Sequence, residues 1–472
     1  MPSHVQPAGA SSEHGPASPA EGASADAAPG VRPTHPMLSP DAPWMSLRHR
    51  VIPVIGNDEH DGAALGVADL AAYRRIAGHA FSMTEEAAAR FLAMSDPGNL
   101  RVVRSQHDPA TVAGGLTMVP MGQFFGGQSV PMVGIAAVAI DPGHRAGGAG
   151  SRLMANMLRD AQAAGYPLSG LYPATQPIYR RVGYEQAGSR WQVDLDLLSI
   201  EAERSGHDVS EVNPEDPEDF ARLRTIYEQR AVARDGHLDR RDYIWRRMFY
   251  PYGEKARVFT VHPEGRPDAP EGYISYRLAD NTADPGRQKM VVTDLQVATP
   301  EAAKRIASFL RMHRSMATVA TIFLAPHDLM FRVLREQWMK VSLKMMWMIR
   351  IVDVKAALEA RGYPADLATS FDLEVYGDTV LPELNNRRFR VTIEGGPAQV
   401  EPDAGDGTIR LHINALASLY SGFLTALELA EEGTLTPRTP APARLTDSAS
   451  TCLLRTLSLA FAGATPWMPD MF

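Results

Sequence analysis

A glycine-rich segment at residues 138–150 has the residue types and spacing to hold a phosphate group. A run of Val, Ile and Ala over 132–140 predicts a strand, and the helix predicted after it has apolar side chains at Leu153, Met154, Met157 and Leu158. Unpaired amides at the start of such a helix carry partial positive charge and attract anions. Glycine lets a ligand approach the backbone closely. The segment therefore predicts a pyrophosphate-binding loop, and the alternative is a plain tight turn.

The spacing of this loop is Arg145-x-x-Gly148-x-Gly150, which differs from the dinucleotide and nucleoside-triphosphate loop patterns. It resembles the coenzyme A pyrophosphate loop of the GNAT acyltransferases. The resemblance implies that the acyl-pantetheine arm lies along the backbone of Val138, Ala139 and Ile140. It also implies that the phosphates lie against Arg145, Ala146, Gly147, Gly148, Ala149, Gly150 and Ser151.

A second motif follows at residues 171–184, where a short strand, a proline-marked break and one helical turn are predicted. The string Ile-Tyr-Arg-Arg-Val-Gly-Tyr at 178–184 resembles the Eis subfamily of N-acetyltransferases. That resemblance implies that Tyr179 donates a proton to the departing thiolate, and that Ala174 and Thr175 lie beside the cofactor. A phenol with an ordinary pKa near 10 is protonated at neutral pH and suits this role. The alternative is a tyrosine that only packs under the helix, as we expect for Tyr184.

The chain ends in an apolar, aromatic segment at residues 467–472, where free termini usually fray. Eis-like enzymes also end in phenylalanine, so the resemblance implies that the α-carboxylate of Phe472 is the general base for the acceptor amine. Burial beside apolar groups would raise the pKa of such a carboxylate toward a useful value. The alternative is a hydrophobic plug that closes the last domain.

Composition indicates a large soluble enzyme. The 472 residues suggest about three domains, and 44% are apolar without a run long enough to cross a bilayer. The single cysteine, Cys452, excludes a disulfide framework and favours a reducing cytoplasm. The net charge of −8 gives no basic face for nucleic acid or an anionic membrane, and the 14 histidines show no metal-ligand spacing. We therefore expect no metal, no nucleic acid and no membrane partner.

The predicted fold class is α+β: tandem GNAT folds, each a mixed sheet flanked by helices, followed by a sterol-carrier-protein-like α+β domain. The expected domains are a disordered leader over 1–44, a catalytic GNAT domain over 45–200, a degenerate GNAT-like domain over 201–352, and the sterol-carrier-protein-like domain over 353–472. The second domain is expected to lack cofactor binding, because its strand runs through Pro300 into Glu301 without a glycine or an arginine in the loop position.

Secondary structure was predicted from periodicity. The first domain is expected to contain strands at 47–55, near Arg101 and Val112, and at 190–197, with helices at 69–81 and 85–94. The second is expected to contain helices at 220–234, 242–249 and 301–316, and strands at 258–261, 273–278, 291–297, 320–324 and 341–352. The third is expected to contain helices at 354–361, 414–429 and 448–461, and strands at 371–375, 389–393 and 408–413, with Pro437, Pro440 and Pro442 in a loop.

The predicted function is an acetyl-CoA-dependent N-acetyltransferase that works by direct attack of a primary amine. The acceptor stays open among an aminoglycoside, another natural-product amine, a peptide and a lysine side chain. Family enzymes bind polycationic aminoglycosides with an acidic residue and aromatics at positions that here are residues 81–84 and 135–137, and with glutamate at the position of Met471. This chain has fewer anions and smaller side chains there, which should weaken attraction for a highly charged amine. The alternative function is a non-catalytic coenzyme A sensor or lipid carrier. The resemblance also implies a homo-oligomer, specifically a hexamer.

Overall fold

The computed structural model describes residues 67–201, 205–438 and 448–472, which belong to one compact unit, residues 39–472. The leader expected at 1–44 and the strand expected at 47–55 lie outside these residues. No helix within the described ranges is long and apolar enough to cross a membrane.

The first lobe runs from α1 to β5 and begins with two helices, of which α1 packs on β2 and β3. Thr84 starts α2, because its hydroxyl accepts a hydrogen bond from the Ala87 amide at 3.2 Å. The elements lie close to their predicted positions: α1 (Val67–Ala80), α2 (Glu85–Leu92), β1 (Leu100–Arg104), β2 (Val112–Phe125), β3 (Gln128–Ile140), α3 (Ala149–Ala163), β4 (Leu168–Leu171), α4 (Gln176–Arg180) and β5 (Glu185–Asp196).

The second lobe repeats this arrangement. Its elements are β6 (His207–Val212), α5 (Pro217–Ala231), β7 (Leu238–Asp239), α6 (Asp242–Phe249), β8 (Arg257–Pro263), β9 (Gly272–Asp280), β10 (Gln288–Val297), α7 (Pro300–Met312), β11 (Ala317–Phe323), α8 (Leu329–Val333) and β12 (Met339–Ile351). The helix expected to reach Met316 ends at Met312, and a short 3-10 turn follows it. In each lobe one strand pairs in parallel with the strand after the next helix: β3 with β4, and β10 with β11.

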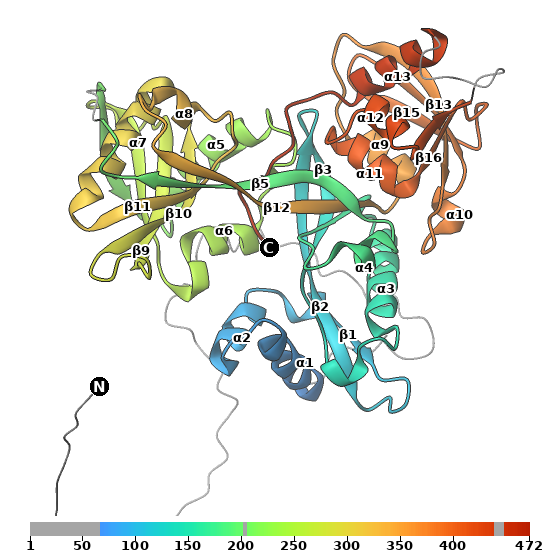
Figure 1. Ribbon diagram of the computed structural model, residues 1–472, viewed down its shortest axis with the longest axis horizontal. Coiled ribbons are helices and arrows are strands. Elements are labelled where there is room, and N and C mark those ends of the chain that lie inside the picture. Colours follow the sequence, from blue (N-terminus) through green and yellow to red (C-terminus); the bar gives the residue numbers. More distant parts are fainter. Residues whose placement is uncertain (1–66, 202–204, 439–447) are drawn as a thin grey trace, which may run out of the picture. The chain divides into compact units, whose positions relative to one another are not determined.

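The last strands of the two lobes are exchanged. Within the described residues a twelve-stranded sheet has the order β1-β2-β3-β4-β12-β5-β11-β10-β9-β8-β6, with β7 pairing to β2. Thus β5 pairs with β11 of the second lobe, and β12 pairs with β4 of the first. Figure 1 shows β5 and β12 crossing between the two lobes. The exchange joins both lobes in one sheet and leaves β4 and β11 with paired rather than open edges.

The third domain is an α+β layer with a five-stranded sheet, in the order β15-β14-β13-β16-β17, among its described residues. Its strands are β13 (Ala368–Tyr376), β14 (Arg388–Glu394), β15 (Ala398–Pro402), β16 (Ile409–His412) and β17 (Leu435–Pro437), and its helices are α9 (Val354–Ala360), α10 (Pro382–Asn385), α11 (Ile413–Ser421), α12 (Ala426–Glu431) and α13 (Ser448–Ala460).

Two local predictions for this domain are wrong. The single helix expected over 414–429 is two helices, because Gly422 adopts a left-handed conformation (φ 74°) that ends α11, and a capping box at Thr425 starts α12. Pro437 lies at the end of β17 rather than in a loop, whereas Pro440 and Pro442 fall outside the described residues.

The third domain packs on the exchanged strands through α11. The Asn414 side-chain amide donates hydrogen bonds to the carbonyls of Arg180 and Tyr184, at 3.0 and 2.9 Å. The Ser418 hydroxyl donates to the Gln186 carbonyl at 2.6 Å. These contacts join the third domain to the segment that carries Tyr179.

Candidate active site

The glycine loop between β3 and α3 is open at the start of the helix. Gly148 is the N-cap of α3 in a left-handed conformation (φ 78°), and no side chain caps the helix. A Cβ atom built at Gly147 or Gly148 would meet no atom closer than 3.8 Å. The first amides of α3 therefore face space in which an anion fits.

Two arginines flank the loop. Arg145 is exposed, and its Nε donates to the Ile140 carbonyl at 3.3 Å. Arg152, which the sequence analysis missed, donates to the Gly147 carbonyl at 3.3 Å and to the Arg104 carbonyl at 3.3 Å. Arg152 could have been predicted from its position four residues after Gly148. Residues four apart lie on the same face of a helix, and helical side chains tilt toward the N-terminus, so Arg152 points back toward the loop. The loop thus combines open amides with two positive charges.

A β-bulge lies at the end of β3, before the loop. Gly115 pairs with Ala139 while Thr117 pairs with Ala136, so β3 has one extra residue at this point. Ala137 adopts φ 53°, and its carbonyl accepts a hydrogen bond from the buried Tyr73 hydroxyl at 2.7 Å. The Tyr73 ring fits because residue 115 is glycine: a Cβ there would lie 2.7 Å from the ring. An extra residue interrupts the ladder of hydrogen bonds, next to the backbone of Val138, Ala139 and Ile140.

Strand β3 continues beyond the end of β4 (Leu168–Leu171). The pairing runs from Met132 with Leu168 to Ile135 with Leu171, whereas β3 continues to Ile140. Ala174 and Thr175 are exposed beyond the end of β4, and Thr175 precedes α4 as its N-cap. The part of β3 next to the glycine loop, residues 136–140, therefore has no partner in β4.

Tyr179 lies in α4 and is 7% exposed. Burial raises the pKa of its phenol above the ordinary value. Its ring makes an edge contact with Tyr184 at 6.1 Å between centroids. The Tyr184 hydroxyl is 2.6 Å from Ser169 Oγ in the core, as predicted for that residue.

The glycine loop and the Tyr179 helix are in contact. A Cβ at Gly150 would lie 3.3 Å from Cδ1 of Ile178, the residue before Tyr179. The start of α3 therefore lies close to α4, beside the residue that precedes Tyr179.

Phe472 is buried, with 7% exposure, and its ring packs on β3. A Cβ at Gly134 would lie 2.8 Å from two ring carbons of Phe472, so this close approach requires glycine. The ring also contacts Tyr172, with 5.7 Å between centroids. Side chains alternate between the faces of a strand: Gly134 faces Phe472, whereas Val133 and Ile135 pack in the same cluster as Tyr179. The two candidate catalytic residues thus lie on opposite faces of β3.

The tail that carries Phe472 is tied along β5. The Met468 amide donates to the Ser189 carbonyl at 3.0 Å, and Arg190 Nε donates to the Pro469 carbonyl at 2.9 Å. The Tyr172 hydroxyl donates to the Asp470 carbonyl at 2.6 Å. Figure 1 shows the C-terminus in the middle of the sheet region, near β12 and α6. The last residues of the chain are therefore held against the first lobe by hydrogen bonds.

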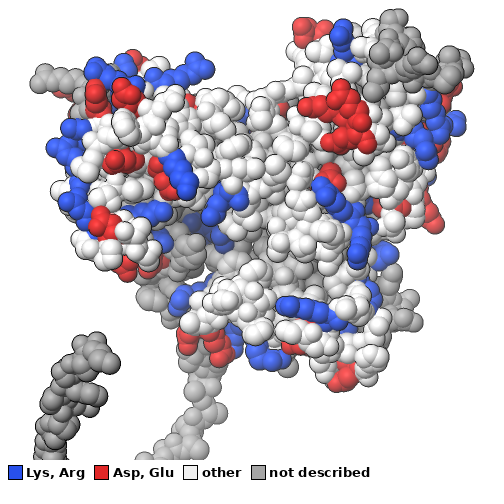
Figure 2. Space-filling view, viewed as in Figure 1, with Lys and Arg blue, Asp and Glu red and all other residues white. Residues whose placement is uncertain are grey.

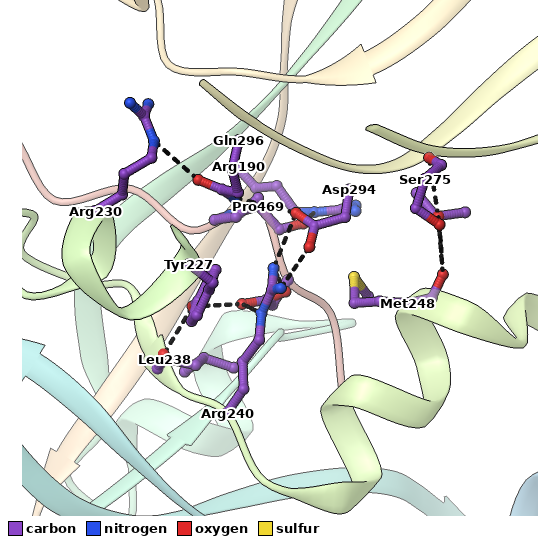
Figure 3. Close-up of polar contacts among 12 residues, drawn as sticks. Arg190, Tyr227, Arg230, Leu238, Arg240, Met248, Ser275, Asp294, Gln296 and Pro469 are labelled. Atoms are coloured by element: carbon purple, nitrogen blue, oxygen red, sulfur yellow. Dashed lines mark hydrogen bonds and ion pairs between the residues drawn. The ribbon is translucent and has the colours of Figure 1, made fainter. Parts of the chain in front are cut away.

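The corresponding strand-to-helix junction of the second lobe is closed. The Thr299 hydroxyl caps α7 by accepting the Ala302 amide at 3.2 Å. Arg230 reaches across from α5 and donates to the Gln296 side chain at 3.1 Å (Figure 3). It also donates to the Val297 carbonyl at the end of β10. Protein groups occupy the place that is open in the first lobe.

Comparisons with known proteins agree with this architecture. Two acetyltransferase (GNAT) domain families match residues 64–187 and 236–351, and the sterol carrier protein domain family matches residues 354–469. Fold and domain content together define a GNAT N-acetyltransferase with a sterol-carrier-protein-like third domain, which confirms the predicted fold class. The chain belongs to the Eis-like family of GNAT N-acetyltransferases, as the motifs predicted.

Three relatives illustrate the similarity. A GCN5-related N-acetyltransferase of known structure from Anabaena variabilis is 30% identical, with a TM-score of 0.77 over 87% of this chain and 99% of that one. An uncharacterized N-acetyltransferase of Streptomyces avermitilis is 29% identical over 74% of this chain and 82% of its own. The N-acetyltransferase Eis of Mycobacterium tuberculosis is 28% identical over 71% of this chain and 79% of its own.

Proposed function

We propose that this N-acetyltransferase transfers an acetyl group from acetyl-CoA directly to a primary amine. The observation that carries the proposal is the contact between Gly150 and Ile178, which holds an open, positively flanked helix start beside the Tyr179 phenol. This arrangement suits a reaction between a phosphate-bearing donor and a group that is protonated as it leaves.

Acetyl-CoA fits the residues of the first lobe. The open amides of α3, with Arg145 and Arg152, would hold its phosphates. The backbone at the β3 bulge would hold the pantetheine arm, as the resemblance implies for residues 138–140. When bound, acetyl-CoA supplies the acetyl group as a thioester.

The residues of this chain move the protons. Tyr179 holds a proton at its hydroxyl, and its raised pKa keeps that proton in place at neutral pH until the thiolate leaves. The α-carboxylate of Phe472 accepts the proton of the amine from the other face of the sheet. Cys452, the one cysteine, lies in α13 of the third domain, so no cysteine supports a covalent acyl-enzyme.

The acceptor is proposed to be an amine with low positive charge, such as a peptide, a lysine side chain or a natural-product amine other than a polycationic aminoglycoside. Helix α6 supplies two arginines beside α2: Arg246 donates to the Met94 carbonyl at 3.2 Å and pairs with Asp242 at 3.8 Å, and Arg247 lies 5.9 Å from the rings of Phe91 and Tyr243. Figure 2 shows Lys and Arg side chains bordering the recess left of centre. Cationic groups repel a polycation.

The second and third domains are proposed to be structural. The closed junction at Thr299 and Arg230 supports a second lobe without cofactor binding, with boundaries near residues 200 and 352. The interior of the third domain is filled by Arg361 among the rings of Tyr363, Tyr420 and Phe461, at 4.8 to 5.2 Å. This packing supports a structural role over a lipid carrier.

We also propose a cytoplasmic homo-oligomer, a hexamer by family resemblance. The single cysteine supports the reducing compartment. Exposed apolar side chains near the start of β12 support a contact between copies: Trp338 is 65% exposed, and Val341 and Leu343 are each 42% exposed. Light scattering of the wild type and of Trp338→Glu tests this; an unchanged mass would contradict the proposed contact.

The test of activity is release of free thiol from acetyl-CoA by protein with an untagged C-terminus. The amine panel contains aminoglycosides, polyamines, lysine peptides and aryl amines. Amine-dependent release is expected, with lysine peptides or aryl amines ahead of aminoglycosides. Binding of acetyl-CoA without release for any amine would instead favour a sensor.

A further inference from the structure

A buried ion network holds the tail two residues before the chain ends. Arg240 donates two hydrogen bonds to Asp470, from Nη2 to Oδ1 at 2.7 Å and from Nε to Oδ2 at 3.1 Å. The same guanidinium pairs with Asp294, including Nη2 to Oδ1 at 3.1 Å. The side chains of Arg240 and Asp470 are 0% exposed and that of Asp294 is 1% exposed.

Aromatic side chains complete the network. Arg240 stacks 3.6 Å from the Tyr227 ring centroid, and the Tyr227 hydroxyl lies 3.3 Å from Asp470 Oδ2. The Tyr273 hydroxyl donates to Asp294 at 2.5 Å. Figure 3 shows Arg240 pointing between Tyr227 and Asp294. One guanidinium therefore joins two carboxylates that arrive from different parts of the chain.

The network connects the second lobe to the tail. Asp294 lies in β10, Arg240 lies between β7 and α6, and Asp470 precedes Met471 and Phe472. The strand β10 corresponds in order to β3, and it also has a bulge, between Val292 and Asp294. In the second lobe this region binds the tail through Arg240 instead of remaining open.

Stability alone does not account for such a network. Two carboxylates and one guanidinium removed from water gain little net stability over apolar side chains of similar size, but their geometry is strongly specified. Two further residues span at most about 7 Å, so fixing Asp470 confines the terminal carboxylate to a small region. What the network specifies is the position of the chain end.

We propose that Arg240 and Asp294 are positioning residues for the α-carboxylate of Phe472, acting through Asp470. The second lobe thus supplies the support for the general base of the first lobe. This inference rests on the proposed role of the Phe472 carboxylate.

Asp294→Asn tests the inference from the second lobe, without changing the tail or the first lobe. We expect kcat to fall about tenfold, because catalysis depends steeply on the placement of reacting groups, while KM for acetyl-CoA changes less than about twofold. Asp470→Asn should have the same effect. Removal of Phe472 by carboxypeptidase, followed by mass spectrometry, should be faster in both variants than in the wild type.

A double-mutant cycle separates positioning from general destabilisation. In protein lacking Phe472, Asp294→Asn should change kcat by less than about twofold, because its effect passes through the missing carboxylate. Asp372→Asn is the matched control. Asp372 is a buried carboxylate in β13 of the third domain, and the substitution removes its ion pair with Arg390 of β14. This control should leave kcat and tail trimming at wild-type values.

The outcomes distinguish the two claims. Suppose that deletion of Phe472 lowers kcat. A wild-type kcat in Asp294→Asn would then overturn the positioning role alone. An equal fall in kcat from Asp294→Asn with and without Phe472 would do the same. If deletion of Phe472 leaves kcat unchanged, the proposed base is wrong and the positioning role falls with it. If Asp294→Asn does not fold, Asp470→Asn gives the same cycle.

Discussion

Gly150 and Ile178 are in direct contact, with 3.3 Å between a Cβ built on the glycine and Cδ1 of the isoleucine. The contact joins the two segments whose motifs are most specific in the sequence: the glycine loop and the Tyr179 string. A side chain at residue 150 would therefore press on Ile178, although no positive φ requires glycine there.

Two glycines of the same loop should respond differently to alanine. Gly147→Ala adds a Cβ that meets only the His144 carbonyl at 3.8 Å, so the melting temperature should stay the same while KM for acetyl-CoA rises. Gly150→Ala places a Cβ 3.3 Å from Cδ1 of Ile178, so Ile178 must shift and kcat should fall. Thermal melts and steady-state kinetics check this; a loss of stability in Gly147→Ala would contradict the open space beside the loop.

Removal of the Tyr179 hydroxyl should affect chemistry and not cofactor binding. In Tyr179→Phe we expect kcat to fall by about 10²-fold or more, the usual contribution of general acid catalysis, with an unchanged Kd for acetyl-CoA by calorimetry. Burial raises the pKa of this phenol above about 10, so the active acid form is lost only as pH rises past that value. The kcat profile should therefore show no decline from Tyr179 below about pH 10. Tyr184→Phe is not a suitable control, because its hydroxyl is bonded in the core.

Tyr73→Phe should disturb the bulge at Ala137. Loss of the hydroxyl bond removes about 1 kcal/mol of stability and releases the Ala137 carbonyl next to the proposed pantetheine arm. We expect a several-fold rise in KM for acetyl-CoA. Tyr276→Phe, which removes a hydroxyl bonded to His313 in the second lobe at 2.9 Å, should leave KM unchanged. Equal kinetic effects of the two variants would show that the Tyr73 bond has no particular role at the bulge.

The two loop arginines should act on the phosphates alone. Arg145→Ala and Arg152→Ala should each raise KM for acetyl-CoA about tenfold, the usual effect of removing a charge-assisted hydrogen bond. Neither should change kcat/KM for acetyl-pantetheine, a donor without the pyrophosphate. Arg159→Ala, which removes an arginine bonded to Asn156 further along α3, is the matched control. An equal loss of kcat/KM with both donors would show that the arginines support folding and do not bind the phosphates.

Local sequence patterns predicted the elements well and their long-range pairing poorly. Hydrophobic period and glycine position are local signals. They were therefore enough to predict the strand, loop and helix at 132–163 and the helix that carries Tyr179. The exchange of β5 and β12 was not, because either strand has the apolar pattern to pair with β4 or β11. Helix 414–429 was overextended because the apolar spacing continues across Gly422, whose left-handed conformation ends α11.

The tail network was also beyond the sequence. Arg240 lies 54 residues from Asp294 and 230 residues from Asp470, and no local pattern around the three residues links them. Only the folded chain shows that all three are buried together. Arg152 differs, since its spacing from Gly148 is a local signal.

The exchanged strands have a consequence for any attempt to divide the protein. A chain cut in the segment between β5 and β6 would give an N-terminal fragment without β12 beside β4, and a C-terminal fragment without β5 beside β11. Each fragment would lack the strand that covers the edge of β4 or of β11 in the whole protein. The two halves should therefore fold when produced together and aggregate when produced apart. In this respect the two lobes behave like a strand-exchanged dimer whose subunits are covalently joined.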